Sequence, residues 1–239
     1  LLLAQTAFGG EVNGTLSSRL DFYPDHADGS SSEGQSTELK IDAFHDFDGS
    51  RIVGEFIFCV YKKDSGRRIT EARQAYFRTP FAGFDVFVGN RQEFWGKAES
   101  KNVVDVINQS DAAANDGKSG KLGAPSISAE RYLDIGDLQL WYISGFREKT
   151  FNDSDAHPSS GVPVSSAQYA RKDDKDADDF AARLSIFAGD WDLAGSFFFF
   201  FARDPIFSVS SDGSVLNPYY VLHKSIGFLA QYFGIFSLL

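Results

Sequence analysis

The chain has 239 residues and a formal net charge of −10. This acidic balance argues against a nucleic-acid partner, whose binding surface normally carries a basic stripe. A single cysteine, Cys59, excludes an intrachain disulfide, and no apolar stretch reaches the roughly 18 residues of a membrane-spanning helix. Aromatic residues make up 15% of the chain, and Gly, Ser, Asp and Asn cluster between the aromatic stretches, which predicts an all-β fold.

Residues 1–9 form an apolar stub that ends in small residues at Ala7 and Gly9. This pattern is typical of the end of a secretory signal peptide that lacks its charged beginning, and an ordinary first strand is the alternative. We expect residues 1–9 to be a signal-peptide remnant and residues 10–239 to be the N-terminal portion of a single β-barrel domain.

From Glu11 onward, apolar and polar residues alternate with a period of two, as in strands that have one apolar and one polar face. The pattern predicts ten strands, over residues 11–23, 36–47, 51–63, 69–78, 84–96, 126–133, 138–149, 179–189, 191–203 and 219–233. The same pattern predicts that Leu16, Phe56, Leu140, Leu184 and Phe199 face outward, and that Arg19, Glu55, Arg147 and Arg183 face inward.

The connections between these strands alternate between short and long. Tight turns are predicted at 47–50, 80–84, 134–137 and 189–190, and longer segments separate the other strands. Outer-membrane barrels have short turns on one side of the membrane and long loops on the other. We therefore predict an antiparallel transmembrane β-barrel of the outer-membrane type. If this prediction is right, the four tight turns should all lie at one end of the sheet. We expect it to be incomplete, with first and last strands that are not hydrogen-bonded to each other.

Residues 197–201 are five consecutive phenylalanines, which fit neither a water-exposed strand nor an amphipathic helix. In a barrel strand, Phe197, Phe199 and Phe201 face lipid, with Trp191 at an aromatic girdle. Phe198 and Phe200 then face the interior. They require an apolar partner there.

Residues 97–125 supply a candidate for this partner, since the segment carries an apolar stripe at Val103, Val104, Val106 and Ile107. Folded inward, the stripe would pack against Phe198 and Phe200 and narrow the pore. An external loop that closes over its own residues is the alternative.

Several motifs resemble a group of Gram-negative outer-membrane proteins similar to the alginate-export and DUF1302-type porins. They are Trp95-Gly96, the Asp105-Val106-Ile107-Asn108 stretch with Asp111, and Lys121-Leu122-Gly123 with Pro125. The stretches 145–151, 189–192 and 217–220 are similar as well, so the likeness covers most of the chain. The resemblance implies a porin-like barrel, and it makes Trp95, Gly96, Asp105, Asn108 and Asp111 candidates for a constriction loop.

Charged residues of both signs are predicted to line the pore. They are Arg19, Glu38, Lys40, Asp42, Glu55, Arg91, Glu93, Arg147 and Arg183. Rings of charge set the selectivity of pores, whereas a solvated polar wall without a selective role is the alternative for each single residue. Arg91 and Glu93 are the best candidates for a selective role.

No enzymatic, metal or cofactor site is predicted. The four His are scattered, and the acidic stretch 152–179 lacks the fixed ligand spacing of a calcium loop. Lys224 is a misfit, because the phase of its strand sends it toward lipid, so that it lies near the rim or the strand carries a bulge.

The function expected from these features is passive passage of small polar or anionic solutes through a channel of the bacterial outer membrane. A plugged surface-binding or scaffold barrel without conductance is the alternative. The expected partners are the lipid bilayer, lipopolysaccharide and small polar solutes, with no nucleic acid.

Overall fold

The computed structural model describes residues 9–22, 33–62, 69–96, 104–110, 121–151, 161–170 and 178–234. The described chain is all-β, and its main element is a sheet of ten strands. These strands are β1 (Gly10–Phe22), β2 (Glu33–Phe47), β3 (Ser50–Lys62), β4 (Ile69–Phe81), β5 (Phe84–Arg91), β8 (Ala124–Leu133), β9 (Gly136–Ile143), β11 (Asp179–Ala188), β12 (Trp191–Phe201) and β15 (Leu222–Tyr232). The predicted all-β class and the number of strands in the sheet are confirmed.

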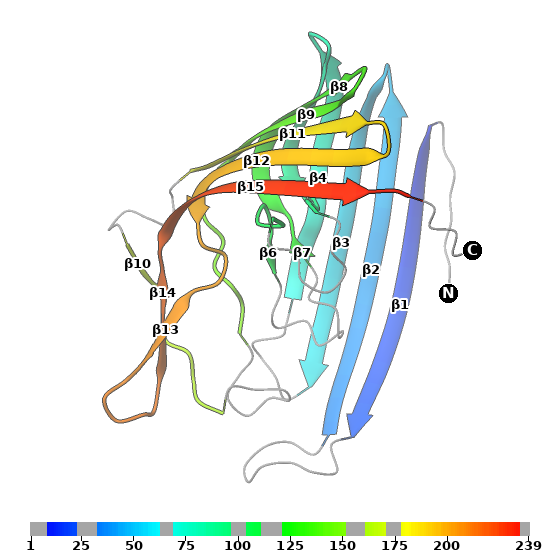
Figure 1. The fold of residues 1–239 in the computed structure, drawn as a ribbon. Helices are drawn as coiled ribbons and strands as arrows, with labels where there is room; N and C mark the ends of the chain where they lie inside the picture. The colour runs from blue at the N-terminus through cyan, green and yellow to red at the C-terminus, as the bar shows by residue number, and fades with distance from the viewer. Residues whose placement is uncertain are drawn as a thin grey trace, which may run out of the picture.

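Each strand of the sheet pairs antiparallel with the next along the chain, in the order β1-β2-β3-β4-β5-β8-β9-β11-β12-β15. The sheet curves so strongly that β15 runs almost across the direction of β1 (Figure 1). Within the described residues, β1 and β15 form the two edges and do not pair with each other. The sheet is therefore open and curved, and its first and last strands are not hydrogen-bonded to each other, as predicted.

The four predicted tight turns join β2 to β3, β4 to β5, β8 to β9 and β11 to β12, and they lie along one edge of the sheet (Figure 1). Two of them have two central residues with positive φ, Asp48-Gly49 and Ala82-Gly83. Positive φ at both central positions defines the hairpin turn whose twist matches that of the flanking strands. Below, this edge is the turn end of the sheet and the opposite edge is the loop end.

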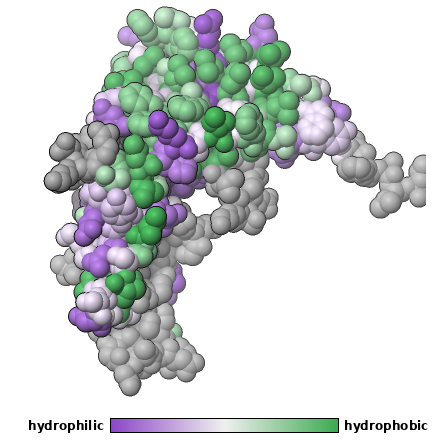
Figure 2. Space-filling model, turned by 60° about the vertical axis from the view of Figure 1, so that its left-hand side comes forward, coloured by the Kyte–Doolittle hydropathy of each residue, from purple (hydrophilic) through white to green (hydrophobic). Residues whose placement is uncertain are grey.

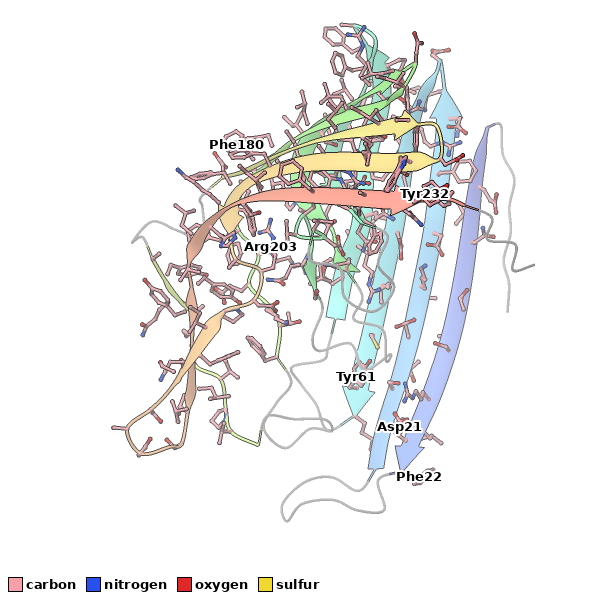
Figure 3. The ribbon with its side chains drawn as sticks, in the orientation of Figure 1. Asp21, Phe22, Tyr61, Phe180, Arg203 and Tyr232 are labelled. Atoms are coloured by element: carbon pink, nitrogen blue, oxygen red, sulfur yellow. The ribbon has the colours of Figure 1, made fainter. Side chains whose placement is uncertain are left out.

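The outer, convex face of the sheet is apolar and exposed. Leu16 is 64% exposed, Phe56, Leu140 and Leu184 are also exposed, and Phe199 is half-buried on the same face. In Figure 2, apolar residues gather over the upper part of the molecule, and in Figure 3 Phe180 projects from the outer side of β11. The predicted outward residues are confirmed, because a period of two places alternate side chains on opposite faces.

Several strand ends differ from the prediction, most of all those of β5 and β9, and the last predicted strand begins later, at Leu222. β5 ends at Arg91 and β9 at Ile143, so that residues 92–96 and 144–149 leave the sheet. Residues 204–218, predicted as a loop, contribute to a second sheet of three strands, β10 (Gln168–Tyr169), β14 (Leu216–Tyr220) and β13 (Ile206–Val209). Phe146, Phe201 and Tyr220 form a buried cluster that joins this small sheet to the loop end of β12.

Candidate functional site

The inner, concave face carries the predicted pore-lining charges on β1 to β3. Pairing places Arg19, Glu38, Lys40, Asp42 and Glu55 on the face that also presents buried Ile57 and Cys59. The Lys40 ammonium lies 3.1 Å from Glu55 and 3.3 Å from Asp42, and Gln74 donates a hydrogen bond of 3.1 Å to Glu55. The side chains of Lys40 and Asp42 are 37% and 44% exposed and that of Glu55 is 17% exposed, so this polar part of the inner face is partly exposed to solvent.

Toward the turn end, the inner face carries further charges that are paired across strands. The Arg51 guanidinium contacts the Asp46 carboxylate at 2.5 Å, and Arg78 contacts Asp85 at 2.7 Å. Because the partners are on neighbouring strands, each pair also fixes the register of the sheet there.

A segment of the chain packs against the inner face of the second half of the sheet. It comprises residues 92–96 and 104–110 together with the short hairpin of β6 (Gln109–Ser110) and β7 (Lys121–Leu122), and it is called the inner segment below. Figure 1 shows β6 and β7 within the concavity of the sheet. An added Cβ at Gly227 of β15 would lie only 3.0 Å from Val104, so the inner segment reaches from β5 to the far edge strand.

Apolar packing is the first interaction that holds the inner segment. Trp95 is 0% exposed, its ring lies 4.9 Å from that of Phe198, and its indole N–H donates a hydrogen bond of 2.6 Å to Gln139. Ile107 and Phe200 belong to the same buried cluster, against which Val106 also packs. Val106 and Ile107 of the predicted apolar stripe therefore pack with the inward phenylalanines, and Trp95 is a further partner. Val103 of that stripe lies outside the described residues.

The last residue of β5, Arg91, has a buried guanidinium group. Arg91 is 8% exposed and donates to Ser128 (2.9 Å), Glu130 (2.5 Å) and Glu93 (2.7 Å). Its Cζ also lies 3.7 Å from the ring centre of Phe87. Arg91 and Glu93 were the best candidates for a selective role, and the structure places both at the attachment of the inner segment to the sheet.

The Glu93 carboxyl, at the same attachment, has a shifted pKa. Burial raises the pKa of the Glu93 carboxyl to about 7, against the opposing effect of the Arg91 charge, and the charge of Glu130 adds to the rise.

Asn108 and Lys121 form hydrogen bonds and an ion pair within the inner segment and to the end of β5. The Asn108 side chain accepts a hydrogen bond from the Glu93 backbone N–H (2.6 Å) and donates one to the Arg91 carbonyl (2.9 Å). The Lys121 ammonium lies 3.1 Å from the Asp105 carboxylate and donates to the carbonyls of Asp105 and Asn108. Three of the constriction-loop candidates, Trp95, Asp105 and Asn108, therefore hold the inner segment in place, while Asp111 lies outside the described residues.

Arg203 fastens the inner segment at the loop end. Its guanidinium donates hydrogen bonds of 3.0 Å each to the carbonyls of Val106 and Ile107, and it lies 2.8 Å from the Asp179 carboxylate. The Gln109 side chain donates in turn to the carbonyls of Arg203 (2.9 Å) and Arg147 (3.1 Å). Burial lowers the pKa of Arg203, and the Asp179 charge opposes that shift. In Figure 3, Arg203 lies on the inner side of the sheet, opposite to the side from which Phe180 projects.

The remaining predicted residues lie around this segment. Arg147 forms an ion pair with Glu71 of β4, and the Arg183 guanidinium lies 5.7 Å from the ring centre of Trp95. The sequence analysis missed Arg203, Asp179, Gln109 and Gln139. One signal was available, because Asp179 is the first residue and Arg203 the last residue of two consecutive predicted strands.

Neither a protein-family model nor a characterised protein matches this chain. In the described part of the chain, no helix is long and apolar enough to cross a bilayer. No group of three or more His, Cys, Asp or Glu among those residues is arranged to hold a metal ion. Interpretation of the site therefore depends on its geometry.

Proposed function

We propose that this chain forms the wall of a channel in the bacterial outer membrane, through which small polar solutes pass passively. The observation that carries the proposal is the exposed apolar outer face, which has large exposed apolar side chains on all ten strands of the main sheet. Water-soluble monomers rarely expose contiguous apolar patches larger than a few hundred Å². A lipid environment accounts for such a face on a sheet whose other face is polar.

The height of the outer face fits a bilayer. The ring centres of Trp191 and Tyr232 lie 5.0 Å apart near the turn end, with the ring planes tilted by 47°, in the position of an aromatic girdle. Phe199, on the same strand as Trp191, is eight residues nearer the loop end, about 26 Å along the strand. With the usual strand tilt this corresponds to about 20 Å of height, near the roughly 25 Å apolar band of outer-membrane barrels.

The inner face supports passage of polar solutes. The half-exposed charges on β1 to β3 lie beside the region that the inner segment covers, and they include both signs. Since many of these charges are paired with each other, they favour small polar solutes over ions of one sign. The proposal requires that the unpaired edges of β1 and β15 find partners in the membrane, because a spanning sheet tolerates no open edge.

A plugged barrel that binds at the cell surface is the second candidate. It is favoured by the tight packing of the inner segment, in which Trp95 and Ile107 are almost completely buried and Val104 reaches the far edge strand. The two candidates differ in whether the open region beside the inner segment conducts.

Electrical recording on planar bilayers separates them. The purified protein should give discrete conductance steps, and Trp95→Ala, which loosens the inner segment, should increase the size of each step. Trp191→Ala on the outer face is the matched control and should leave the step size unchanged. Protein that inserts into vesicles without conducting would favour the plugged barrel, and protein that does not insert would refute the membrane assignment.

A further inference from the structure

The outer face is hollowed between β8 and β12. The hollow has a volume of about 400 Å³, and its walls include the exposed Ile127, Leu140, Phe180 and Phe197 and the half-buried Tyr142. Two small side chains, Ala129 and Ala182, stand in the same cross-strand row as Leu140 and Phe197. The recess therefore arises from alternating small and large residues, and its size falls within the range of ligand-binding pockets.

A cation lies on the same face beside this hollow. Lys224 is exposed on β15, directly opposite Phe199 of β12, and its ammonium lies 5.3 Å from the centre of that ring. The pairing of β12 with β15 is continuous from Trp191 to Phe201, so no bulge turns the lysine inward. Lys224 is two residues from the start of β15, which places it near the loop-end rim, one of the two positions that its sequence phase allowed.

The charge of Lys224 has no anionic partner in the described part of the chain. A lysine on the lipid-facing surface of a barrel is unfavourable, least so near the interface where lipid headgroups lie. Phosphate oxygens form strong charge-assisted hydrogen bonds with an ammonium group. A lipid phosphate at the level of Lys224 would therefore supply the missing partner.

We propose that the hollow and Lys224 together form a binding site for a phosphorylated, multiply acylated lipid of the outer leaflet. An acyl chain would occupy the apolar hollow, and a phosphate would contact Lys224. This inference rests on the proposed function, since the hollow faces lipid only if the outer face lies in the membrane.

The arrangement of the face fixes the direction of the lipid. The row Ile127, Tyr142, Phe180, Phe199 and Lys224 crosses the sheet near the loop end, and the rest of the hollow lies one row closer to the turn end. A chain in the hollow would thus run from the rim toward the bilayer centre.

The test is binding of diphosphorylated lipid A to the purified protein in detergent micelles, measured by native mass spectrometry. Lys224→Gln should weaken binding about tenfold, and Ala182→Phe, which fills the hollow, should weaken it by a similar factor. Arg131→Gln is the matched control, because Arg131 is also exposed and lies 5.4 Å from the ring centre of Phe84 near the turn end. Its binding should equal that of the wild type.

Equal binding by the wild type, Lys224→Gln and Ala182→Phe would overturn the inference, as would equal binding of the dephosphorylated lipid. A protein dimer that Ala182→Phe dissociates would also overturn it, because a second copy would then occupy the hollow. Recording on bilayers keeps the two proposals separate. A wild type that conducts but shows none of the expected losses refutes the lipid site alone, whereas a wild type that never enters bilayers refutes the proposed function.

Discussion

Replacing Arg203 by Met should release the inner segment from the sheet. The substitution keeps much of the side-chain volume but removes the donors to the carbonyls of Val106 and Ile107, and it leaves the Asp179 carboxylate buried without its cation. Removing one partner of a buried ion pair typically costs about 3–5 kcal/mol. If most of this cost favours the detached segment, the detached population rises by about a hundredfold or more.

Thiol labelling measures that population. Cys59 is buried and can be replaced by Ala, and Ile107→Cys then places the single thiol at a buried position of the inner segment. Labelling of Cys at position 107 with a maleimide should be at least a hundredfold faster with Arg203→Met than with Arg203 intact. Arg131→Met, an exposed arginine on the outer face, should leave the rate unchanged. Equal labelling rates with and without Arg203 would refute the view that this guanidinium holds the segment.

Three further predictions concern the turn end, the outer face and the buried carboxyl. Ala82 has a positive φ of 53°, so Ala82→Gly should raise the free energy of unfolding by about 1 kcal/mol in urea titrations, and an unchanged midpoint would contradict strain in this turn. Leu184→Lys on the outer face should lower the stability in lipid bilayers by about 2–4 kcal/mol, whereas Thr15→Lys on the inner face should change it little; equal effects would contradict the assignment of the faces. The raised pKa of Glu93, about 7, means that the folded state binds its proton more tightly than the unfolded state. The free energy of unfolding should therefore fall by up to about 3 kcal/mol as the pH rises from about 4.5 to 7. Glu93→Gln should abolish this pH dependence of stability. A pH dependence that persists in the variant would assign it to other groups.

The strands and their faces follow from the sequence alone. A period of two is a local property of extended backbone, so the outward positions of Leu16 and Leu184 and the inward positions of Glu55 and Arg183 could be read without any knowledge of the curvature. The tight turns were equally local, since Asp48-Gly49 carries its turn preference in two residues. Short elements escaped this reading: β10 has two residues and β13 has four, too few to show a period.

The attachment of the inner segment was decided only by the tertiary structure. An apolar stripe and two inward phenylalanines indicated that the segment could fold inward, but an external loop accounted for the same residues. The contacts that select between them join distant parts of the chain: Trp95 and Gln139 are 44 residues apart, and Arg203 and Val106 are 97 residues apart. Strand pairing also explains why Arg91, which was expected to line the pore, is buried. Ser128 and Glu130 come within hydrogen-bond distance of Arg91 only when β5 pairs with β8, and Glu93 contacts the same guanidinium. Periodicity specifies the face on which a side chain lies, whereas its partner on that face depends on pairing and curvature that no local pattern records.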